Sequence, residues 1–283
     1  MTKYKIEEFY LEEDSFDEFT ANGQIEFDFS DMQENQPCFI VNMGTDEKAI
    51  GIYKDSMLYK TTNHSLGAIK PIDPLQHIFA NQILDNKIPL NIALGPAGTG
   101  KTLMAIAAAM KLIDSKQHYS SLILTKPLEQ VGFRRIGDLP GGLDEKLDPY
   151  MQSFYGAFSL LYSKNYMHYI STLRSSNKLD IVPMQFMRGM DFKNSIIIAD
   201  EMQNASLEEL KTLTTRVHSS SKLILLGDLK QIDLKKKDDN FFGAIIDNKH
   251  FIESSLTSLI ELNKVQRSPL TELMINIFDS MDL

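Results

Sequence analysis

Short apolar runs alternate with amphipathic stretches from about residue 75 to the end of the chain. Runs such as LNIAL and SIIIA are nearly continuous in aliphatic residues, which is typical of strands buried on both faces of a parallel sheet. Between them, apolar residues recur every three or four positions, as on helices. The alternation predicts an α/β fold whose parallel sheet is sandwiched by helices. The predicted strands are 90–94, 121–125, 179–183, 195–199, 222–227 and 256–262, and the predicted helices are 75–84, 102–113, 150–162, 206–217, 241–247 and 269–281.

The first 70 residues have a different pattern. Short apolar runs between residues 24 and 60 are separated by polar turns, which predicts a small antiparallel sheet or a partial barrel. Residues 1–20 are acidic with interspersed Phe and Tyr, and we interpret them as a short helix or a tail. The Gly- and Pro-rich stretch SLGAIKPIDP indicates a linker. We therefore expect a small β-rich N-terminal segment with its linker over 1–70, followed by one α/β domain over 71–283.

The composition excludes several classes of protein. The chain is 43% hydrophobic and 24% charged, as in ordinary globular proteins. It has no run of about 18 apolar residues, so we expect no membrane span. The acidic N-terminus lacks the apolar core of a signal peptide, and the single cysteine, Cys38, excludes an internal disulfide framework. These features predict a cytoplasmic location, and the six scattered histidines show no metal-ligand spacing.

The net charge of −9 is concentrated near the N-terminus. Residues 1–70 contain 14 acids and 6 lysines, a balance of −8, whereas residues 71–283 contain 24 acids and 23 bases, a balance of −1. The overall field therefore does not attract nucleic acid, and any nucleic-acid site must be a local basic groove. The acidic residues 1–60 are instead a candidate surface for a protein partner.

The stretch GPAGTGKT, residues 95–102, fits the pattern G-x-x-x-x-G-K-[ST] without deviation. It follows a predicted strand and opens an Ala-rich predicted helix, which is the context in which this motif cradles phosphates. Its glycines let backbone N–H groups turn toward phosphate oxygens, and the helix N-terminus adds a positive dipole end. We expect Lys101 to reach the β- and γ-phosphates of ATP, and the Thr102 hydroxyl to bind Mg²⁺. The predicted nucleotide-binding residues are Gly95, Pro96, Ala97, Gly98, Thr99, Gly100, Lys101 and Thr102.

Two adjacent acids, Asp200 and Glu201, follow the predicted strand 195–199. A metal–phosphate site needs a carboxylate at the C-terminal end of a neighbouring strand, so Asp200 is the expected Mg²⁺ ligand, acting through water. Hydrolysis also needs a base that orients and deprotonates water beside the γ-phosphate, and this role is expected for Glu201. The alternative is an acid at a helix start that only accepts backbone N–H groups.

A second strand ends in LLGDLKQIDL, residues 225–234. The pattern G-D-x-x-Q at a strand end resembles the third motif of superfamily 1 helicases, in which the glutamine senses the γ-phosphate. We therefore expect Gln231 to act in catalysis and Asp228 to contact the water network or the Mg²⁺ shell. The alternative is a pair of turn residues that cap a strand.

Several motifs together resemble the PhoH-like P-loop ATPases, in the order of that family and over roughly residues 70–280. This resemblance implies a RecA-like core and an ATPase described as an RNA helicase or translocase, prone to form hexameric rings. The ends resemble a longer subgroup, in which a PIN ribonuclease domain precedes a small β segment. About 70 residues are too few for that domain, so we expect the nuclease to be missing. The motifs are GPAGTGKTLMAIAAAM, GFRRIGDLPGGLDEKLDPYMQSFYGAF, PMQFMRGMDFKNSIIIADEMQNAS, LKTLTTRVHSSSKLILLGDLKQIDL and VQRSPLTELM.

The resemblance also implies roles for residues outside these strand ends. Gln76 matches a glutamine that reads adenine; the alternative is an exposed helix residue. Arg267 matches an arginine that contacts the γ-phosphate in cis or reaches the nucleotide of a neighbouring subunit. Arg188 and Arg216 are the other candidates, with a plain surface or structural arginine as the alternative. Lys126 stands where the family usually has arginine, which keeps the charge and loses the bidentate fork.

The loop 132–148 is the expected nucleic-acid element. Basic residues in and near it are candidate phosphate contacts, and Phe133 and Tyr150 are candidate stacking platforms. The alternative is a solvated loop that packs on a neighbouring subunit. The nucleic-acid candidates are Lys126, Phe133, Arg134, Arg135, Lys146 and Arg188.

Three functions fit these residues. The first is an ATP-driven motor on RNA or other single-stranded nucleic acid, and the second is a nucleotide-gated adaptor that acts on a protein partner. The third, a small-molecule kinase, fits less well, because a kinase uses a substrate group rather than water as its nucleophile.

Overall fold

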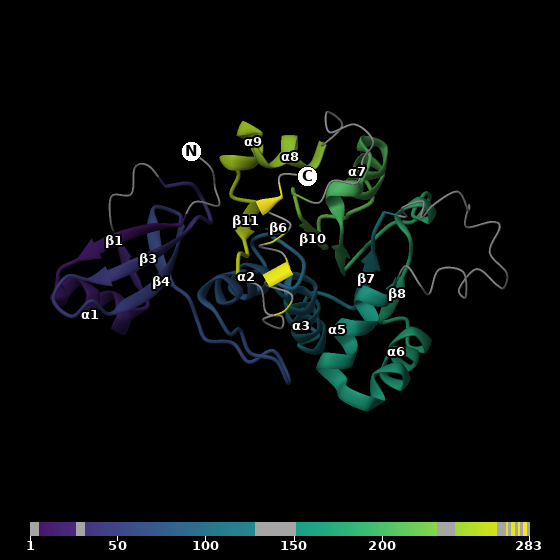
Figure 1. Ribbon diagram of the computed structural model, residues 1–283, viewed down its shortest axis with the longest axis horizontal. Coiled ribbons are helices and arrows are strands. Elements are labelled where there is room, and N and C mark those ends of the chain that lie inside the picture. The colour runs from purple at the N-terminus through teal and green to yellow at the C-terminus, as the bar shows by residue number, and fades with distance from the viewer. Residues whose placement is uncertain are drawn as a thin grey trace.

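The computed structural model describes residues 6–26, 32–127, 151–230 and 241–264, together with six separate positions between Leu270 and Met281. These residues form two sheets that lie side by side (Figure 1). The N-terminal sheet has the strand order β1-β3-β4-β5-β2, and the core sheet has the order β11-β6-β10-β9-β7-β8. None of the helices in the described part of the chain is long and apolar enough to cross a membrane.

The N-terminal sheet confirms the predicted small β-rich segment but not all of its pattern. Strands β3, β4 and β5 pair antiparallel, as expected, whereas β1 pairs parallel with β3 after α1 has crossed over. The interpretation of residues 1–20 as a helix or a tail was wrong for β1, because its acidic edge-strand sequence EEFYL hides the alternation. The elements are β1 Glu7–Leu11, α1 Glu13–Asn22, β2 Gln24–Glu26, β3 Pro37–Asn42, β4 Lys48–Lys54 and β5 Met57–Lys60.

The core sheet is parallel at every described ladder, as the apolar runs predict. Its strands are β6 Leu90–Leu94, β7 Ser121–Thr125, β8 Leu179–Ile181, β9 Ser195–Ala199, β10 Lys222–Gly227 and β11 Thr257–Glu261. The helices are α2 Pro74–Leu84, α3 Lys101–Asp114, α5 Gln152–Tyr162, α6 Tyr166–Ser175, α7 Leu207–Thr214, α8 Phe241–Ile246 and α9 Lys249–Ile252, with 3₁₀ turns at η3 Ser163–Asn165, η4 Met184–Phe186 and η5 Met202–Asn204.

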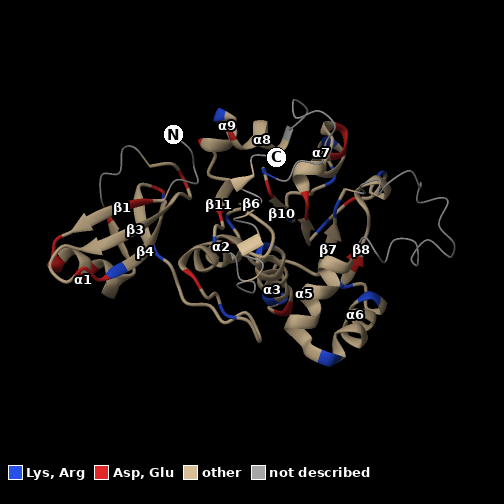
Figure 2. Ribbon diagram, in the orientation of Figure 1, with Lys and Arg blue, Asp and Glu red and all other residues tan. Residues whose placement is uncertain are grey.

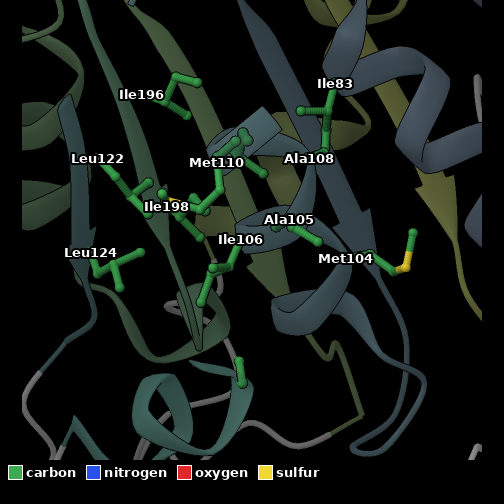
Figure 3. Packing of buried hydrophobic residues seen from close by; sticks show 14 of the residues in the cluster. Ile83, Met104, Ala105, Ile106, Ala108, Met110, Leu122, Leu124, Ile196 and Ile198 are labelled. Atoms are coloured by element: carbon green, nitrogen blue, oxygen red, sulfur yellow. The ribbon is translucent and has the colours of Figure 1, made fainter. Parts of the chain in front are cut away.

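Helices cover both faces of the core sheet (Figure 1). Alternate residues of β9 point to opposite faces: Ile196 and Ile198 pack with α2, α3 and α5, whereas Ile197 and Ala199 pack with α7 and α8. Figure 3 shows side chains of β7 and β9 facing the buried residues of α3. The four alanines of α3 are buried, and their small size lets the helix lie close to the sheet.

The strand order brings the P-loop, Asp200 and Asp228 to one edge of the core sheet. Strand β10 lies between β6, which precedes the P-loop, and β9, which precedes Asp200. All strands run in the same direction, so the residues that follow β6, β7, β9 and β10 emerge together at the C-terminal edge of the sheet. With β11 on the far side of β6, this is the order of a RecA-like core, to which β8 adds an edge strand.

The two sheets are joined by polar contacts from buried side chains. The Asn35 amide nitrogen donates to the carbonyls of Ser255 and Thr257, at 2.8 and 3.0 Å, where β11 begins. Gln82 of α2 donates to the Asn35 carbonyl at 3.3 Å. Lys54 of β4 pairs with Asp85, just after α2, at 2.5 Å. The predicted boundary at residue 70 stays a prediction.

Candidate functional site

The P-loop is held against the ends of two neighbouring strands. The Gly95 N–H donates to the Gly227 carbonyl of β10 at 3.1 Å, and the Leu262 N–H donates to the Leu94 carbonyl at 2.8 Å. A Cβ atom at Gly95 would lie 2.0 Å from the Leu262 carbonyl oxygen, and Gly95 has a φ of 138°. Only glycine fits this position, because both its backbone conformation and its surroundings exclude a side chain.

Lys101 is the first residue of α3, and its ammonium lies within the P-loop. It donates to the Gly95 carbonyl and, at 3.0 Å, to the Pro96 carbonyl. Thr99 is buried, and its hydroxyl also donates to the Pro96 carbonyl at 3.0 Å. The loop therefore places a positive charge and a helix N-terminus at the same point, which is the arrangement that binds phosphate.

Thr102 and Asp200 meet across the site, although they are 98 residues apart. The Thr102 hydroxyl donates to Asp200 Oδ2 at 2.8 Å. Burial raises the pKa of Asp200, and the charge of Glu201 acts in the same direction, whereas the Thr102 hydrogen bond and Lys101 oppose it. A cation beside this carboxylate would offset the cost of its burial.

The residues at this point fit a magnesium ion. Mg²⁺ is usually held by one or two carboxylates together with phosphate oxygens and water, rather than by an all-protein cage. A hydroxyl and a carboxylate in contact beside a phosphate-binding loop match that requirement. The described residues contain no group of three or more His, Cys, Asp or Glu that would form a cage.

Glu201 has a left-handed backbone conformation, with a φ of 56°. Its N–H donates to Asp200 Oδ1 at 3.0 Å, so the two adjacent acids have different surroundings. Glu201 occupies the N-cap position of η5, but its side chain makes no capping hydrogen bond. The carboxylate instead accepts a hydrogen bond at 2.7 Å from the side chain of Gln203. The alternative of a helix-capping acid therefore does not describe this residue.

Asp228 follows β10 at the same edge and is 6% exposed. Its Oδ1 accepts the Lys230 N–H at 2.9 Å, and its own N–H donates to Gln203 Oε1 at 3.0 Å. Its Oδ2 has no hydrogen-bond partner among the described residues, and neither has Thr125 Oγ1 at the end of β7. Unpaired buried oxygens are costly, and they favour a ligand that brings water or a cation to this edge.

Gln203 is a site residue that the sequence analysis did not identify. It is 1% exposed and joins the segment after β9 to the end of β10. The pattern DEMQN contained a signal, because two residues after Glu201 a short turn can bring a side chain back to the carboxylate. Its contact with Asp228 depends on β9 and β10 being neighbours, which only the tertiary structure shows.

Gln76 is buried beneath the P-loop, so the alternative of an exposed helix residue is wrong. Its Nε2 donates to the Thr99 carbonyl at 3.0 Å, and its Oε1 accepts the Ile72 N–H at 3.1 Å. The side chain lies close to Gly100, where a Cβ atom would be 2.9 Å from Nε2. Gln76 therefore supports the phosphate loop, and adenine recognition stays a prediction.

The two predicted arginines that the structure describes, Arg188 and Arg216, make no described contact with the P-loop site. Arg216 lies beyond the end of α7 at the N-terminal edge of the sheet, where its carbonyl accepts the Phe192 N–H at 3.0 Å. It therefore lies far from the nucleotide site of its own chain. Arg188 is an exposed residue paired with Glu208, and such a solvent-exposed ion pair is weak. Lys126 is half-buried just after β7, at the edge that carries Asp200.

The remaining candidates lie outside the described residues. They are Gln231, Arg267, Phe133, Arg134, Arg135, Lys146 and Tyr150, together with the loop 132–148 that contains four of them.

A family model described as PhoH-like protein matches residues 68–279, which include every described part of the P-loop site. The chain belongs to the PhoH-like family. This confirms the resemblance read from the motifs. Together with the P-loop geometry, it identifies an α/β RecA-like core that carries a phosphate-binding loop.

Curated relatives match this chain over part of their own length. A PhoH-like protein of Mycobacterium tuberculosis is 39% identical over 166 residues, which cover 59% of this chain and 45% of the relative. Protein PhoH2 of Bacillus subtilis is 31% identical over 240 residues, 83% of this chain and 54% of the relative. The chain thus spans about half the length of each. Among solved structures, the Pif1 helicase of Candida albicans is similar with a TM-score of 0.38 and 17% identity over 75% of this chain and 44% of that one, which is too distant to inform function.

Proposed function

We propose that this PhoH-like chain hydrolyses ATP with Mg²⁺ and couples hydrolysis to binding of, and movement along, single-stranded RNA or DNA. The observation that supports hydrolysis is a continuous series of contacts at one edge of the core sheet. The series runs from Thr102 to Asp200, then to Glu201, Gln203 and Asp228. These contacts support the proposal because they join the phosphate loop, the pair of residues proposed to hold Mg²⁺ and the proposed base in one hydrogen-bonded unit.

In this proposal, Lys101 and the P-loop N–H groups hold the β- and γ-phosphates. Thr102 and Asp200 are the residues that would hold Mg²⁺, which supplies charge neutralisation to the phosphate oxygens when bound. Glu201 accepts a proton from a water molecule whose oxygen attacks the γ-phosphorus. The bond between that phosphorus and the β–γ bridging oxygen breaks, and ADP and phosphate are released.

Two residues outside the described part of the chain complete the proposal. Gln231 senses the γ-phosphate, and Arg267 contacts the nucleotide of its own or a neighbouring subunit. Arg216 acts only across a subunit boundary, because it lies at the opposite edge of the sheet from its own P-loop. We propose a hexameric ring on the basis of the family resemblance, and a cytoplasmic location on the basis of the composition.

Support for nucleic acid comes from the family motifs rather than from the described surface. The loop 132–148 holds most of the predicted contacts. In the described part of the chain Lys126 is the candidate that lies at the edge carrying the P-loop and is not engaged in a described ion pair. RNA is the first choice of substrate, because the resemblance is to ATPases described as RNA helicases.

A second function is favoured by the acidic face of α1. Glu13, Asp14, Asp17 and Glu18 are all exposed on this short helix. Figure 2 shows acidic positions in red on α1. Such a face suits a basic protein partner. In this alternative, ATP binding controls whether the N-terminal sheet is accessible to the partner, and ATP hydrolysis is slow.

Steady-state ATP hydrolysis with Mg²⁺, with and without single-stranded RNA, tests the proposal. We expect RNA to raise the rate several-fold, and Glu201→Gln to lower kcat by about 10²- to 10⁴-fold, as loss of a general base does. Lys101→Ala should abolish nucleotide binding and activity. Single-stranded DNA of the same sequence distinguishes the two nucleic acids.

Slow hydrolysis that no nucleic acid stimulates would contradict the motor and favour the adaptor. An unchanged kcat in Glu201→Gln would contradict the assigned base. Transfer of the γ-phosphate to a small acceptor, rather than to water, would indicate that the protein is a small-molecule kinase.

A further inference from the structure

Gln203 links the two strand ends on which the proposed hydrolysis depends. Its Nε2 donates to Glu201 Oε2 at 2.7 Å, and its Oε1 accepts the Asp228 N–H at 3.0 Å. It is 1% exposed, so both ends of the carboxamide are engaged away from bulk water. The side chain therefore couples the segment after β9 to the segment after β10.

The surroundings are built to hold this side chain in place. At Gly227, a Cβ atom would lie 3.1 Å from Gln203 Oε1 and 2.6 Å from the ring of Phe242. Gly227 thus leaves the space that the carboxamide fills. Gln203 sits in η5, whose 3₁₀ turn begins at Glu201 and returns the chain over its own start. A residue with both a donor and an acceptor at this reach is required to satisfy both partners.

The hydrogen bond from Gln203 also restrains the Glu201 side chain, which would otherwise be free to rotate. A glutamate has three rotatable torsions, and a base that deprotonates water must present its oxygen within hydrogen-bond distance of that water. Gln203 engages Oε2 of Glu201, and we assign water activation to the other oxygen, Oε1. The same carboxamide binds the Asp228 N–H, three residues before Gln231, the proposed γ-phosphate sensor.

We propose that Gln203 is a positioning residue, which holds the Glu201 carboxylate for water activation and ties its orientation to the end of β10. The inference rests on the proposed role of Glu201 as the base. It predicts that loss of Gln203 slows hydrolysis without weakening ATP binding. A residue that merely stabilised the fold would instead affect stability and nucleotide affinity together.

The test uses two variants of the full chain. Gln203→Leu keeps the volume and removes both hydrogen bonds, whereas Gln203→Glu keeps an acceptor for the Asp228 N–H and loses the donor to Glu201. We expect each to lower kcat by about 10- to 100-fold, as a misplaced catalytic group does. The dissociation constant of a fluorescent ATP analogue should stay within about twofold of wild type, which marks loss of an interaction made in the transition state.

Gln185→Leu is the matched control. The Gln185 side chain donates to the Glu209 carboxylate at 2.5 Å, which is the same chemical pair on an exposed surface. Its removal should leave kcat unchanged. If Gln203→Leu fails to fold, Gln203→Glu still carries the test, because it retains the bond to β10.

The outcomes separate the two claims. A wild-type kcat in either Gln203 variant, with Glu201→Gln inactive, would overturn the positioning role alone. A parallel loss of ATP affinity and thermal stability would also overturn it in favour of a structural role. An active Glu201→Gln would remove the proposed base, and the positioning role with it. A kcat loss in both Gln203 variants and in Glu201→Gln, with ATP affinity kept in the Gln203 variants and kcat unchanged in Gln185→Leu, supports the inference.

Discussion

At the scale of single residues, the P-loop depends on close approach between backbone segments. The Leu262 carbonyl oxygen lies so close to Gly95 that a Cβ atom there would clash with it. The φ of 138° at Gly95 is also accessible at little cost only to glycine. The motif therefore serves two purposes at this position. It turns the chain toward the phosphate site, and it lets β11 join β6 through the Leu262 N–H bond to the Leu94 carbonyl.

We predict that Gly95→Ala lowers the free energy of unfolding by about 3 kcal/mol or more, because backbone strain of about 1–3 kcal/mol adds to the displacement of Leu262. Urea denaturation measures this change. Gly156→Ala is the control, since Gly156 lies within α5 and its Cβ would meet no atom within 4 Å. That variant should gain about 0.5–1 kcal/mol. Equal stabilities for the two variants would contradict the close approach.

At the scale of elements, β10 contributes to the site at one end and carries a buried lysine at the other. Lys222 begins this strand and is fully buried. Its ammonium lies within hydrogen-bond distance of the Asp85 carbonyl at 2.9 Å, the Ile88 carbonyl at 2.5 Å and Asn91 Oδ1 at 3.3 Å. Burial lowers the pKa of Lys222 to about 7, and Lys54 acts in the same direction, whereas Asp85 opposes the shift.

This shift predicts a pH-dependent stability. Between pH 7 and 10 the unfolded chain binds a proton at Lys222 that the folded chain has largely released, so the contribution of this residue to stability rises with pH and is lost as the pH falls toward 7. We expect the difference in unfolding free energy between wild type and Lys222→Met to rise across this window, by at most about 1.4 kcal/mol per pH unit.

Urea denaturation at pH 7, 8, 9 and 10 measures that difference. These pH values cover the range between the lowered pKa of Lys222 and the ordinary pKa of a lysine. Lys87→Met is the control, because it removes an exposed lysine close in sequence to Asp85. Its difference from wild type should be independent of pH. A pH-independent difference for Lys222→Met would mean that the buried ammonium keeps its proton throughout.

At the scale of the whole molecule, polar groups in the described part of the chain help to fasten the N-terminal sheet to the core, beside apolar packing such as that of Ile50. Asn35 is 1% exposed and has a φ of 62°, which points its amide toward the start of β11. The ion pair between Lys54 and Asp85 lies nearby and is partly shielded from solvent. Leu262, directly after β11, packs against Gly95 of the P-loop. The Asn35 hydrogen bonds therefore connect the N-terminal sheet to the strand that precedes this contact.

We predict that Asn35→Gly lowers the free energy of unfolding by about 1–3 kcal/mol, because it keeps the positive φ and leaves the buried Thr257 carbonyl and the partly buried Ser255 carbonyl without their donor. Asn177→Gly is the control, since Asn177 has a φ of 55° at an exposed position after α6. That change should stay within about 0.5 kcal/mol. Equal effects in urea denaturation would show that Asn35 does not fasten the sheet to the core.

The core strands could be predicted because each is a run of aliphatic residues flanked by polar turns. Helix α6 and strand β1 were not predicted, because neither has a clear pattern of apolar residues. Only Ile170 and Leu173 of α6 are buried, and β1 is an acidic edge strand. Their apolar faces are too narrow to produce a pattern, and neighbouring elements stabilise them. The parallel pairing of β1 with β3 likewise follows from the α1 crossover rather than from local sequence.

The sequence by itself predicted the phosphate loop, the pair of residues proposed to hold Mg²⁺ and the adjacent proposed base, because each prediction depends on residue types at fixed local spacings after a strand. It also determined the family and the parallel α/β core. Only the tertiary structure showed which strand ends meet, because β10 lies between β6 and β9. It also showed that Gln76 is buried beneath the P-loop and that Arg216 lies at the N-terminal edge of the core sheet. It also revealed Gln203, whose two partners are joined only when β9 and β10 pair, since hydrogen bonds act over about 3 Å whatever the separation in sequence.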